Sequence, residues 1–278
     1  MLLRISCAGA RLRSAAFAAF LVLPQDSDSP CAADTISVSC GTEAQSNFTM
    51  HPLDNVIWQA LTTRQAQFAE AFDGARRFFR EVTLLSAFEE PTADGYAALA
   101  GLVGADTTAV FLDNPYEARP EWDFVAGAPL LQMVCEDGTR VRPAEAIEIV
   151  ELGSPDSSEM RELTTLTKPG PFGPRTHELG NYVGIREDRK LVAMAGERLK
   201  VPGYTEVSAV CTHPQHTGKG YAAVLMTEIM RRIRERGETP FLHVRQDNAR
   251  AVVLYERLGF KTRKLTHFAV LRRAKQNS

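Results

Sequence analysis

The sequence predicts an α/β protein of the α+β type, in which helices flank a mixed central sheet. Helical and extended patterns follow one another without strict alternation, so a purely parallel sheet is not expected. The chain of 278 residues is long enough for two modest domains. Hydrophobic residues make up 44% and charged residues 24%, which are ordinary values for a globular protein with a sizeable core.

Composition and turn residues divide the chain into three parts. Residues 1–49 carry arginines but no acid before Asp26, so we expect a disordered leader or an upstream extension before a start at Met50. A signal peptide is the alternative, but polar residues separate its apolar stretch from Cys31-Ala32-Ala33. A polar, turn-like stretch after residue 136 then divides a smaller α+β N-terminal domain, residues 50–140, from a second domain, residues 141–278.

The N-terminal domain contains no chemical motif. Apolar residues among polar ones predict helices over 54–72 and 93–103. Short extended runs, bounded by proline and glycine, predict strands over 107–112 and 130–135. This half is expected either to border the functional site of the second domain or to form part of a degenerate copy of that domain.

The second domain has a more regular pattern. Its helix over 221–236 places Leu225, Ile229 and Ile233 on one side and is followed by Gly237, a typical residue after a helix end. The other predicted elements are strands over 146–151, 181–186, 191–199, 205–212, 241–245 and 265–271, and helices over 155–166 and 249–258.

A glycine-rich turn, Thr217-Gly218-Lys219-Gly220-Tyr221-Ala222, lies between a strand and an amphipathic helix. Glycines let the backbone turn sharply so that N–H groups converge, and the helix adds unpaired amides and the positive end of its dipole. A pyrophosphate fits such a site, with the Lys219 charge at its rim. The turn and Ala223 also satisfy a dinucleotide fingerprint, but too few residues follow Ala223 for the rest of that domain.

The segment 242–260 places Asn248 at a strand end and Tyr255 on the next helix, before Leu258-Gly259-Phe260. Together with the turn, it resembles the GNAT superfamily of N-acetyltransferases over about residues 147–271. The resemblance implies a mostly antiparallel sheet with flanking helices, acetyl-CoA as co-substrate and no metal. Thr217 departs from the family, which usually has Arg or Gln at this position. Because the loop binds through backbone amides, this difference affects the fine affinity for the cofactor and leaves the assignment unchanged. Part of the domain is also similar to the C-terminal region of glycine N-acyltransferases, which leaves the acyl length open.

The resemblance implies a role for each matching residue. One of the amides of Val210, Cys211 and Thr212 would polarise the thioester carbonyl. Asn248 would bind the pantetheine arm, and a helix N-cap is a compatible alternative. Tyr255 would protonate the departing thiolate, and a core aromatic is the alternative. The implied cofactor-binding set is Val210, Cys211, Thr212, Thr217, Gly218, Lys219, Gly220, Tyr221, Ala222 and Asn248.

Glu206 is the candidate catalytic base. Strand alternation predicts that it lies on the face opposite Val207, Ala209 and Cys211, where it would face the cleft and accept the proton of an amine. A solvated strand glutamate is the alternative. Metal binding by Cys211 with its neighbouring histidines, or a Cys211 nucleophile, is not favoured because cofactor binding already explains that segment.

The sequence therefore predicts an acetyl-CoA-dependent N-acetyltransferase that transfers an acyl group to a primary amine of a small molecule or peptide. The alternatives are a non-catalytic acyl-CoA-binding sensor and an enzyme for a longer acyl-CoA, and the presence of Glu206 and Tyr255 favours an enzyme. The net charge of −2 argues against a nucleic-acid partner. The odd number of cysteines, five, predicts a cytoplasmic protein, and the absence of a bilayer-length apolar run predicts no membrane partner. We expect a monomer or a homodimer.

Overall fold

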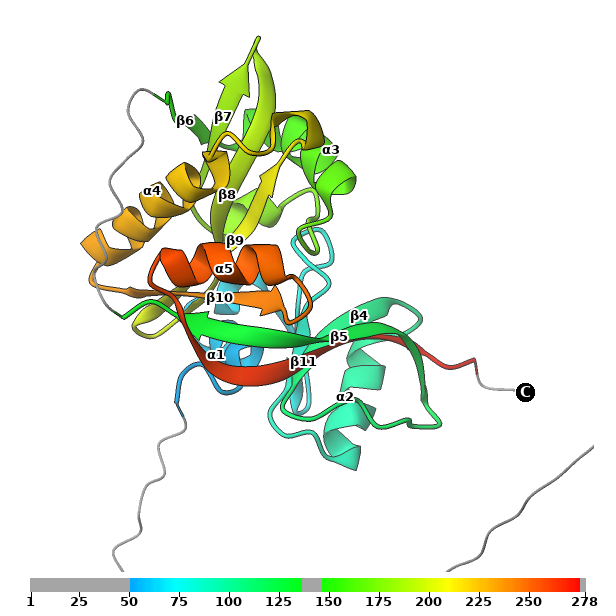
Figure 1. Ribbon diagram of the computed structural model, residues 1–278. Helices are drawn as coiled ribbons and strands as arrows, with labels where there is room; N and C mark the ends of the chain where they lie inside the picture. Colours follow the sequence, from blue (N-terminus) through cyan, green and yellow to red (C-terminus); the bar gives the residue numbers. More distant parts are fainter. Residues whose placement is uncertain (1–50, 137–146, 276–278) are drawn as a thin grey trace, which may run out of the picture. The chain divides into compact units, whose positions relative to one another are not determined.

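A computed structural model describes residues 51–136 and 147–275 (Figure 1). The expected leader, residues 1–49, and the expected domain boundary near residue 140 lie outside the described residues. The signal-peptide alternative and three of the five cysteines, Cys7, Cys31 and Cys40, fall in the same N-terminal part.

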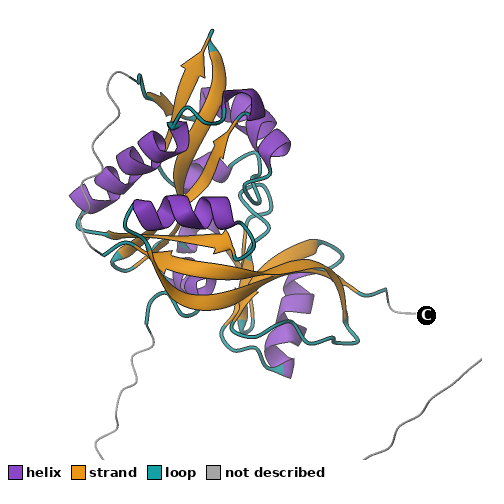
Figure 2. Ribbon diagram, in the orientation of Figure 1, coloured by secondary structure: helices purple, strands orange, loops and turns teal. Residues whose placement is uncertain are grey.

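The described residues form helices, strands and short 3₁₀ turns (Figure 2). The α-helices are α1 (Val56–Thr62), α2 (Ala93–Val103), α3 (Ser157–Thr167), α4 (Tyr221–Glu235) and α5 (Ala249–Arg257). The 3₁₀ turns are η1 (Ala66–Phe68), η2 (Ser154–Asp156), η3 (Thr176–Leu179) and η4 (Pro214–His216). The strands are β1 (Ala69–Phe72), β2 (Ala75–Phe78), β3 (Ser86–Phe88), β4 (Thr107–Leu112), β5 (Trp122–Val134), β6 (Val150–Leu152), β7 (Tyr182–Glu187), β8 (Lys190–Val201), β9 (Tyr204–Thr212), β10 (Thr239–Arg245) and β11 (Lys261–Arg273).

Eight strands form one twisted sheet in the order β4-β11-β5-β10-β9-β8-β7-β6. Every neighbouring pair is antiparallel except β9 and β10, which are parallel, so the predicted mixed, mostly antiparallel α+β fold is confirmed. β4 and β5 come from the half that the sequence assigns to an N-terminal domain. They pair with β11 and β10, so the two predicted parts share a single sheet.

β5 is longer than the predicted strand over 130–135, because it pairs with β11 along nearly its whole length. Figure 1 shows these two strands as a long curved ribbon that extends beyond the rest of the sheet. A smaller sheet of β1, β2 and β3 lies beside this extension and packs against α2.

The predicted helix over 54–72 is wrong in its second half. The helix α1 ends at Thr62, and Ala69–Phe72 form β1, which pairs with β2 across the two-residue turn Asp73-Gly74. An Asp-Gly pair between extended segments is typical of a hairpin, and Asp73 adopts φ +44°. The hairpin turn therefore prevails over the helical spacing of the apolar residues before it.

Helices cover both faces of the central sheet. On one face, α4 buries Leu225, Ile229 and Ile233 against β7, β8, β9 and β10, as the helical spacing predicts, and α5 packs beside it. On the other face, α3 packs on β8 and β9, and α1 packs on β8. Figure 1 shows α4 and α5 on the near side of the sheet. This arrangement places the N-terminus of α4 next to the end of β9.

Candidate active site

The parallel strands β9 and β10 separate near the middle of the sheet. Their pairing covers only three positions, from Thr239 opposite Tyr204 to Phe241 opposite Glu206. Beyond these positions β9 continues to Thr212, while β10 stays paired with β5 up to Arg245. The facing edges of the two strands therefore keep backbone N–H and C=O groups that are free to bind a ligand.

A β-bulge at Ala209 marks the start of this gap. Ser208 pairs with Gly196 and Cys211 with Met194, so two residues of β9 stand opposite one residue of β8. Ala209 itself adopts φ +52°, a conformation that residues other than glycine rarely take. Bulges commonly redirect a strand next to a functional site.

The bulge changes which side chains share a face of β9. Val207 packs in the core under α4, whereas Ala209 and Cys211 pack with Met160 of α3 on the other face. The prediction that Val207, Ala209 and Cys211 share one face is therefore wrong, because the extra residue reverses the alternation.

The glycine-rich turn leads directly into α4. Gly218 and Gly220 adopt φ +86° and φ +79°, and a Cβ atom at either position would meet no neighbouring atom. Their requirement is therefore for backbone conformation rather than for space. The first turn of α4 contains no acidic side chain, so its unpaired N–H groups and the helix dipole are available to an anion. The turn fits the pyrophosphate that the sequence predicts for it.

Lys219 points away from this cradle, toward Glu187 of β7. Its Nζ lies 2.7 and 2.9 Å from the two carboxylate oxygens, and the Tyr221 hydroxyl donates to the same carboxylate. The hydrogen bonds from Lys219 and Tyr221 hold the pKa of Glu187 at about 2. The charge of Lys219 is thus paired with an ionised acid.

The turn opens into a cavity of about 750 Å³. Val210, Cys211 and Thr212 line one side of it, and Asn248 and Tyr255 line the other. The remaining predicted cofactor residues on its wall are Thr217, Gly218, Gly220, Tyr221 and Ala222, so Lys219 alone of the predicted set does not line it.

Asn248 caps α5, as its Oδ1 accepts a hydrogen bond of 3.2 Å from the Ala251 backbone N–H. The helix-cap interpretation is therefore confirmed. The side chain also borders the cavity, so the structure is compatible with both predicted roles for Asn248.

A family model described as FR47-like protein matches residues 182–269. A protein from Novosphingobium aromaticivorans, described as an acetyltransferase of the GNAT family, is 35% identical over 81% of this chain and 100% of its own, with a TM-score of 0.75. A GCN5-related N-acetyltransferase from Kribbella flavida has the same fold at 17% identity, over 79% of this chain and 97% of its own, with a TM-score of 0.54. No curated protein sequence matches this chain.

This chain belongs to the GNAT family. The family consists of acyl-CoA-dependent N-acetyltransferases, and its acetyltransferases use acetyl-CoA, in agreement with the cradle at the start of α4. The similarities do not single out the glycine N-acyltransferase branch. Over residues 51–136 and 147–275, no cluster of three metal-ligating side chains occurs, and no helix has the length and apolar character to cross a bilayer.

Tyr255 lies where the cavity at the glycine-rich turn, the candidate acetyl-CoA cavity of this GNAT protein, meets a second cavity on the other side of the β9–β10 gap. Burial raises the pKa of its hydroxyl to about 12, so the phenol keeps its proton. Its ring contacts Phe260 edge-on, with centroids 6.2 Å apart. The position suits a proton donor, and the ring also contributes to packing.

Cys211 is buried, and burial raises the pKa of its thiol to about 11. A thiol of this kind remains protonated near neutral pH and is a poor nucleophile. This observation supports the interpretation that Cys211 contributes backbone groups rather than a reactive sulfur.

Glu206 is buried and forms the centre of an ion cluster. Arg198 donates to its two oxygens from Nε and Nη2 at 2.8 Å each, and the ring of His243 lies 2.8 Å away through Nδ1. Burial alone would raise the pKa of Glu206, but the charge and hydrogen bonds of Arg198, assisted by His243, outweigh it and hold the pKa at about 2. Glu206 is therefore an ionised carboxylate at neutral pH.

The hydrogen bonds around His243 indicate its tautomer. Gln132 accepts from Arg263 through Oε1, so its amide nitrogen is the group that faces His243 Nε2, 3.2 Å away. The Nε2 atom is then an acceptor, and Nδ1–H donates to Glu206. Within the cluster, the charge of Arg198 is balanced by that of Glu206.

The second cavity, of about 650 Å³, is the candidate acceptor cleft. It shares Val210, Cys211, Thr212, Asn248, Arg250 and Tyr255 with the candidate acetyl-CoA cavity. Arg198 and His243 line it, but Glu206 does not. The prediction that the Glu206 side chain faces the cleft is therefore wrong, because Arg198 and His243 occupy that wall.

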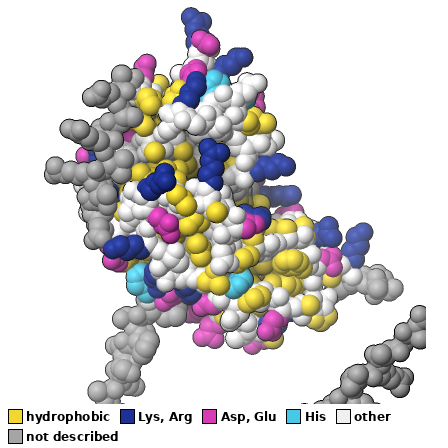
Figure 3. Space-filling view, viewed as in Figure 1, with side chains coloured by type: hydrophobic (Ala, Val, Ile, Leu, Met, Phe, Trp, Pro, Cys, Tyr) yellow, Lys and Arg dark blue, Asp and Glu magenta, His cyan; other side chains and the backbone are white. Residues whose placement is uncertain are grey.

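Figure 3 shows, on the α5 face, basic side chains standing beside a band of hydrophobic ones.

Arg198 and His243 are functional candidates that sequence reasoning did not identify. Arg198 lies on β8 beside Glu206 on β9, and His243 follows two residues after Phe241, the partner of Glu206 on β10. A polar or charged residue within a strand was the available signal in each case, but it becomes informative only once the strand order is known.

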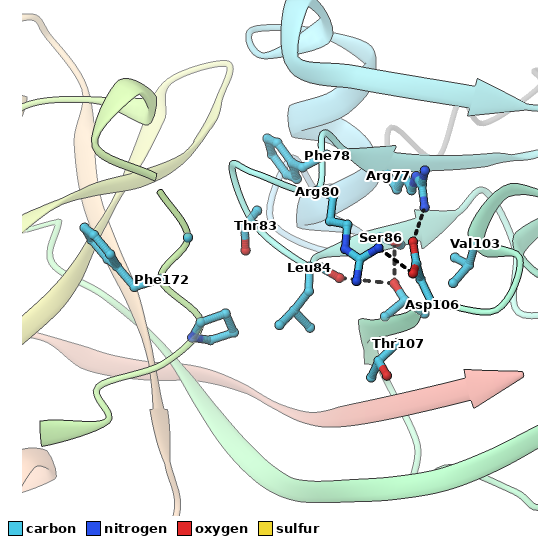
Figure 4. Close-up of a pocket in the computed structure, with 13 residues that line it drawn as sticks. Arg77, Phe78, Arg80, Thr83, Leu84, Ser86, Val103, Asp106, Thr107 and Phe172 are labelled. Carbon is cyan, nitrogen blue, oxygen red and sulfur yellow. Dashed lines mark hydrogen bonds and ion pairs between the residues drawn. The ribbon is translucent and has the colours of Figure 1, made fainter. Parts of the chain in front are cut away.

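A third cavity, of about 310 Å³, lies on the other side of the proline-rich loop 168–174. Figure 4 shows Arg77 and Arg80 converging on the carboxylate of Asp106, at 3.6 and 2.6 Å. Arg77 also pairs with Glu70. The cavity is thus lined by arginines whose charges are already matched by acids, and it has no cradle for a phosphate.

Proposed function

We propose that this chain transfers an acetyl group from acetyl-CoA to a primary amine by direct attack on the thioester. The observation that supports this most strongly is the continuity of the two cavities at Val210–Thr212 and Tyr255. The thioester of a CoA molecule held at Gly218 and Gly220 would reach this junction. An amine in the second cavity would then meet the thioester carbonyl without a covalent enzyme intermediate.

The chemistry uses backbone groups and one side chain. The amine nitrogen attacks the carbonyl carbon, and a backbone N–H among Val210, Cys211 and Thr212 stabilises the oxyanion. The carbon–sulfur bond then breaks, and Tyr255 donates its proton to the sulfur. The proton lost by the new amide nitrogen returns to the Tyr255 oxygen through water, so protons and electrons balance.

Glu206 takes a supporting part in this proposal. A carboxylate with a pKa of about 2 that is bound by a guanidinium is a weak proton acceptor. Its contacts instead fix Arg198 and His243 on the wall of the acceptor cleft. We therefore assign Glu206 as a positioning residue for these two side chains, in place of the base that the sequence predicts.

Titration of the full chain with acetyl-CoA in a calorimeter, beside a thiol-release assay with a panel of primary amines, tests the proposal. The expected result is binding together with amine-dependent release of CoA. Binding without turnover of any amine would identify a sensor, and absence of binding would contradict the proposal. Repeating the assay with propionyl-, butyryl- and benzoyl-CoA distinguishes an enzyme for longer acyl groups.

A further inference from the structure

The acceptor cleft has an unusual charge for an enzyme that acylates amines. Among its described lining residues there are four cations, Lys168, Arg198, Arg245 and Arg250, and neither Asp nor Glu. An ammonium or polyamine acceptor would normally be met by acidic side chains. Arg198 and Arg245 are paired with Glu206 and Asp247, so the positive field of the cleft comes from Lys168 and Arg250, and it disfavours a substrate that carries positive charge only.

Three of the four cations, Lys168, Arg198 and Arg245, line the acceptor cleft and not the acetyl-CoA cavity. Arg250 also borders the acetyl-CoA cavity, and Arg245 is paired with Asp247 at 2.9 and 2.6 Å. Lys168 and Arg198 line the acceptor cleft and do not line the acetyl-CoA cavity. The phosphates of CoA therefore do not account for them.

Arg198 keeps one donor group for a ligand. Its side chain is 10% exposed, and Glu206 occupies Nε and Nη2. Within the described part of the chain Nη1 has no hydrogen-bond partner, and it lies close to Gly170 of the cleft wall. The bidentate contact with Glu206 holds the guanidinium plane in one orientation, so Nη1 is a preorganised donor.

Lys168 provides a second positive charge on the same wall. It ends α3 in a left-handed conformation, with φ +51°, and begins the proline-rich loop that borders the cleft. Lys168 is exposed and forms no ion pair with another described residue. Apolar side chains such as Phe111 and Phe268 also line the cleft, beside polar ones such as Ser208.

From this arrangement we infer that the acceptor is a small amine that also carries an anionic oxygen group, bound by Arg198 Nη1 and Lys168. This inference rests on the proposed function. The anion would orient the molecule so that its amine faces the junction at Tyr255. The same cations disfavour an ammonium group and so favour the neutral amine that attacks the thioester.

Matched acceptors test the inference with the full chain and acetyl-CoA. Each set contains an α-amino acid, its carboxamide, the corresponding amine without the carboxylate, an aminoalkyl phosphate and a diamine. We expect kcat/KM for the carboxylate or phosphate member to exceed that of the neutral amide by about 10- to 100-fold, as for a charge-assisted hydrogen bond. Preference for the carboxylate or for the phosphate identifies the source of the anion.

Equal or better turnover of the neutral and cationic members would overturn the inference and leave the proposed function standing. Absence of acetyl transfer to every amine, from a protein that binds acetyl-CoA, would overturn both.

Variants locate the anion on the two cations. Lys168→Ala and Arg198→Met are expected to raise KM for the anionic acceptor by about 10-fold or more, with KM for acetyl-CoA and for the neutral amide unchanged. Lys190→Ala, which removes an exposed lysine outside the cleft, is the matched control and should change neither. Because Arg198→Met leaves Glu206 without its partner and can unfold the chain, Lys168→Ala carries the test by itself. An unchanged KM in Lys168→Ala would contradict the inference.

Discussion

The acceptor cleft and the cavity shown in Figure 4 both contain arginine beside a carboxylate, but they use the pair differently. In the cavity of Figure 4, Arg80 is largely exposed, with 71% of its side chain accessible, and it shares Asp106 with Arg77. In the cleft, Arg198 is buried against a fully buried Glu206 and keeps Nη1 for a ligand. Exposed ion pairs contribute little and exchange with water, whereas a buried pair fixes the geometry of a donor. The comparison indicates that burial, rather than the presence of arginine, distinguishes a binding wall from an ordinary polar surface.

The largest effect is expected on acetyl-CoA affinity, which a substitution at the glycine-rich turn should change and a substitution beside the cavity of Figure 4 should not. Gly218→Glu places a negative side chain beside the predicted pyrophosphate and should abolish acetyl-CoA binding, with an affinity loss of at least about 100-fold. Gly104→Glu is the matched control, because Gly104 also has a positive φ, of 61°, and open space, but lies next to the cavity of Figure 4. Calorimetric titration of both variants checks the prediction. Equal affinity in the two variants would remove the argument for the cradle.

Stability gives the second test of the comparison. Glu206→Gln breaks a buried ion pair and should lower the free energy of unfolding by about 3–5 kcal/mol at pH 7, whereas Asp106→Asn should cost no more than about 1 kcal/mol. Urea denaturation of both variants measures the difference. Similar losses would show that burial does not distinguish the two pairs.

The effect of Glu206 depends on pH in a defined direction. The pKa of Glu206 is about 2 in the folded protein, below its ordinary value of 4.5. Its ionised form therefore stabilises the fold fully above about pH 4.5, and this contribution is lost as the pH falls from 4.5 toward 2. The stability difference between the wild type and Glu206→Gln should shrink over the same range.

Catalysis gives the third test. Tyr255→Phe should lower kcat by about 100-fold while KM for acetyl-CoA changes by no more than about 2-fold, because the phenol acts on the leaving sulfur. Tyr116→Phe is the control, since Tyr116 lies in neither part of the cleft. Because the pKa of Tyr255 is about 12, wild-type activity should not fall through its ionisation below that pH. A loss of stability with unchanged kcat would identify Tyr255 as a packing residue only.

Local patterns predicted the secondary structure and backbone conformation around the candidate cofactor cavity well. The helical spacing of Leu225, Ile229 and Ile233 gave α4 almost to its ends, and the glycines before it mark the cradle. These features depend on backbone conformation and on residues close together in the sequence. The confirmed cap by Asn248 is of the same kind.

The acceptor half depends on contacts between strands, which single-sequence patterns do not contain. The bulge at Ala209 has no residue signature, because alanine seldom adopts a positive φ. It reverses the alternation of β9, and the irregular register between β8 and β9 brings Arg198 to Glu206. The Glu206 prediction was therefore wrong about its surroundings: the residue lies behind Arg198 and His243, which line the cleft in its place.

Lys219 should have the smallest effect, because the structure gives it a partner in Glu187. Lys219→Ala removes a positive charge near the cradle, but that charge is exposed and paired at 2.7 Å, so acetyl-CoA affinity should fall by only about 2-fold. Lys190→Ala is the control for loss of an exposed lysine. Glu187→Gln should have the opposite sign, since it removes the acid and releases Lys219 toward the phosphates. A fall of 10-fold or more in Lys219→Ala would show that the ligand breaks the pair with Glu187, and the cradle would then depend on a side chain as well as on its backbone.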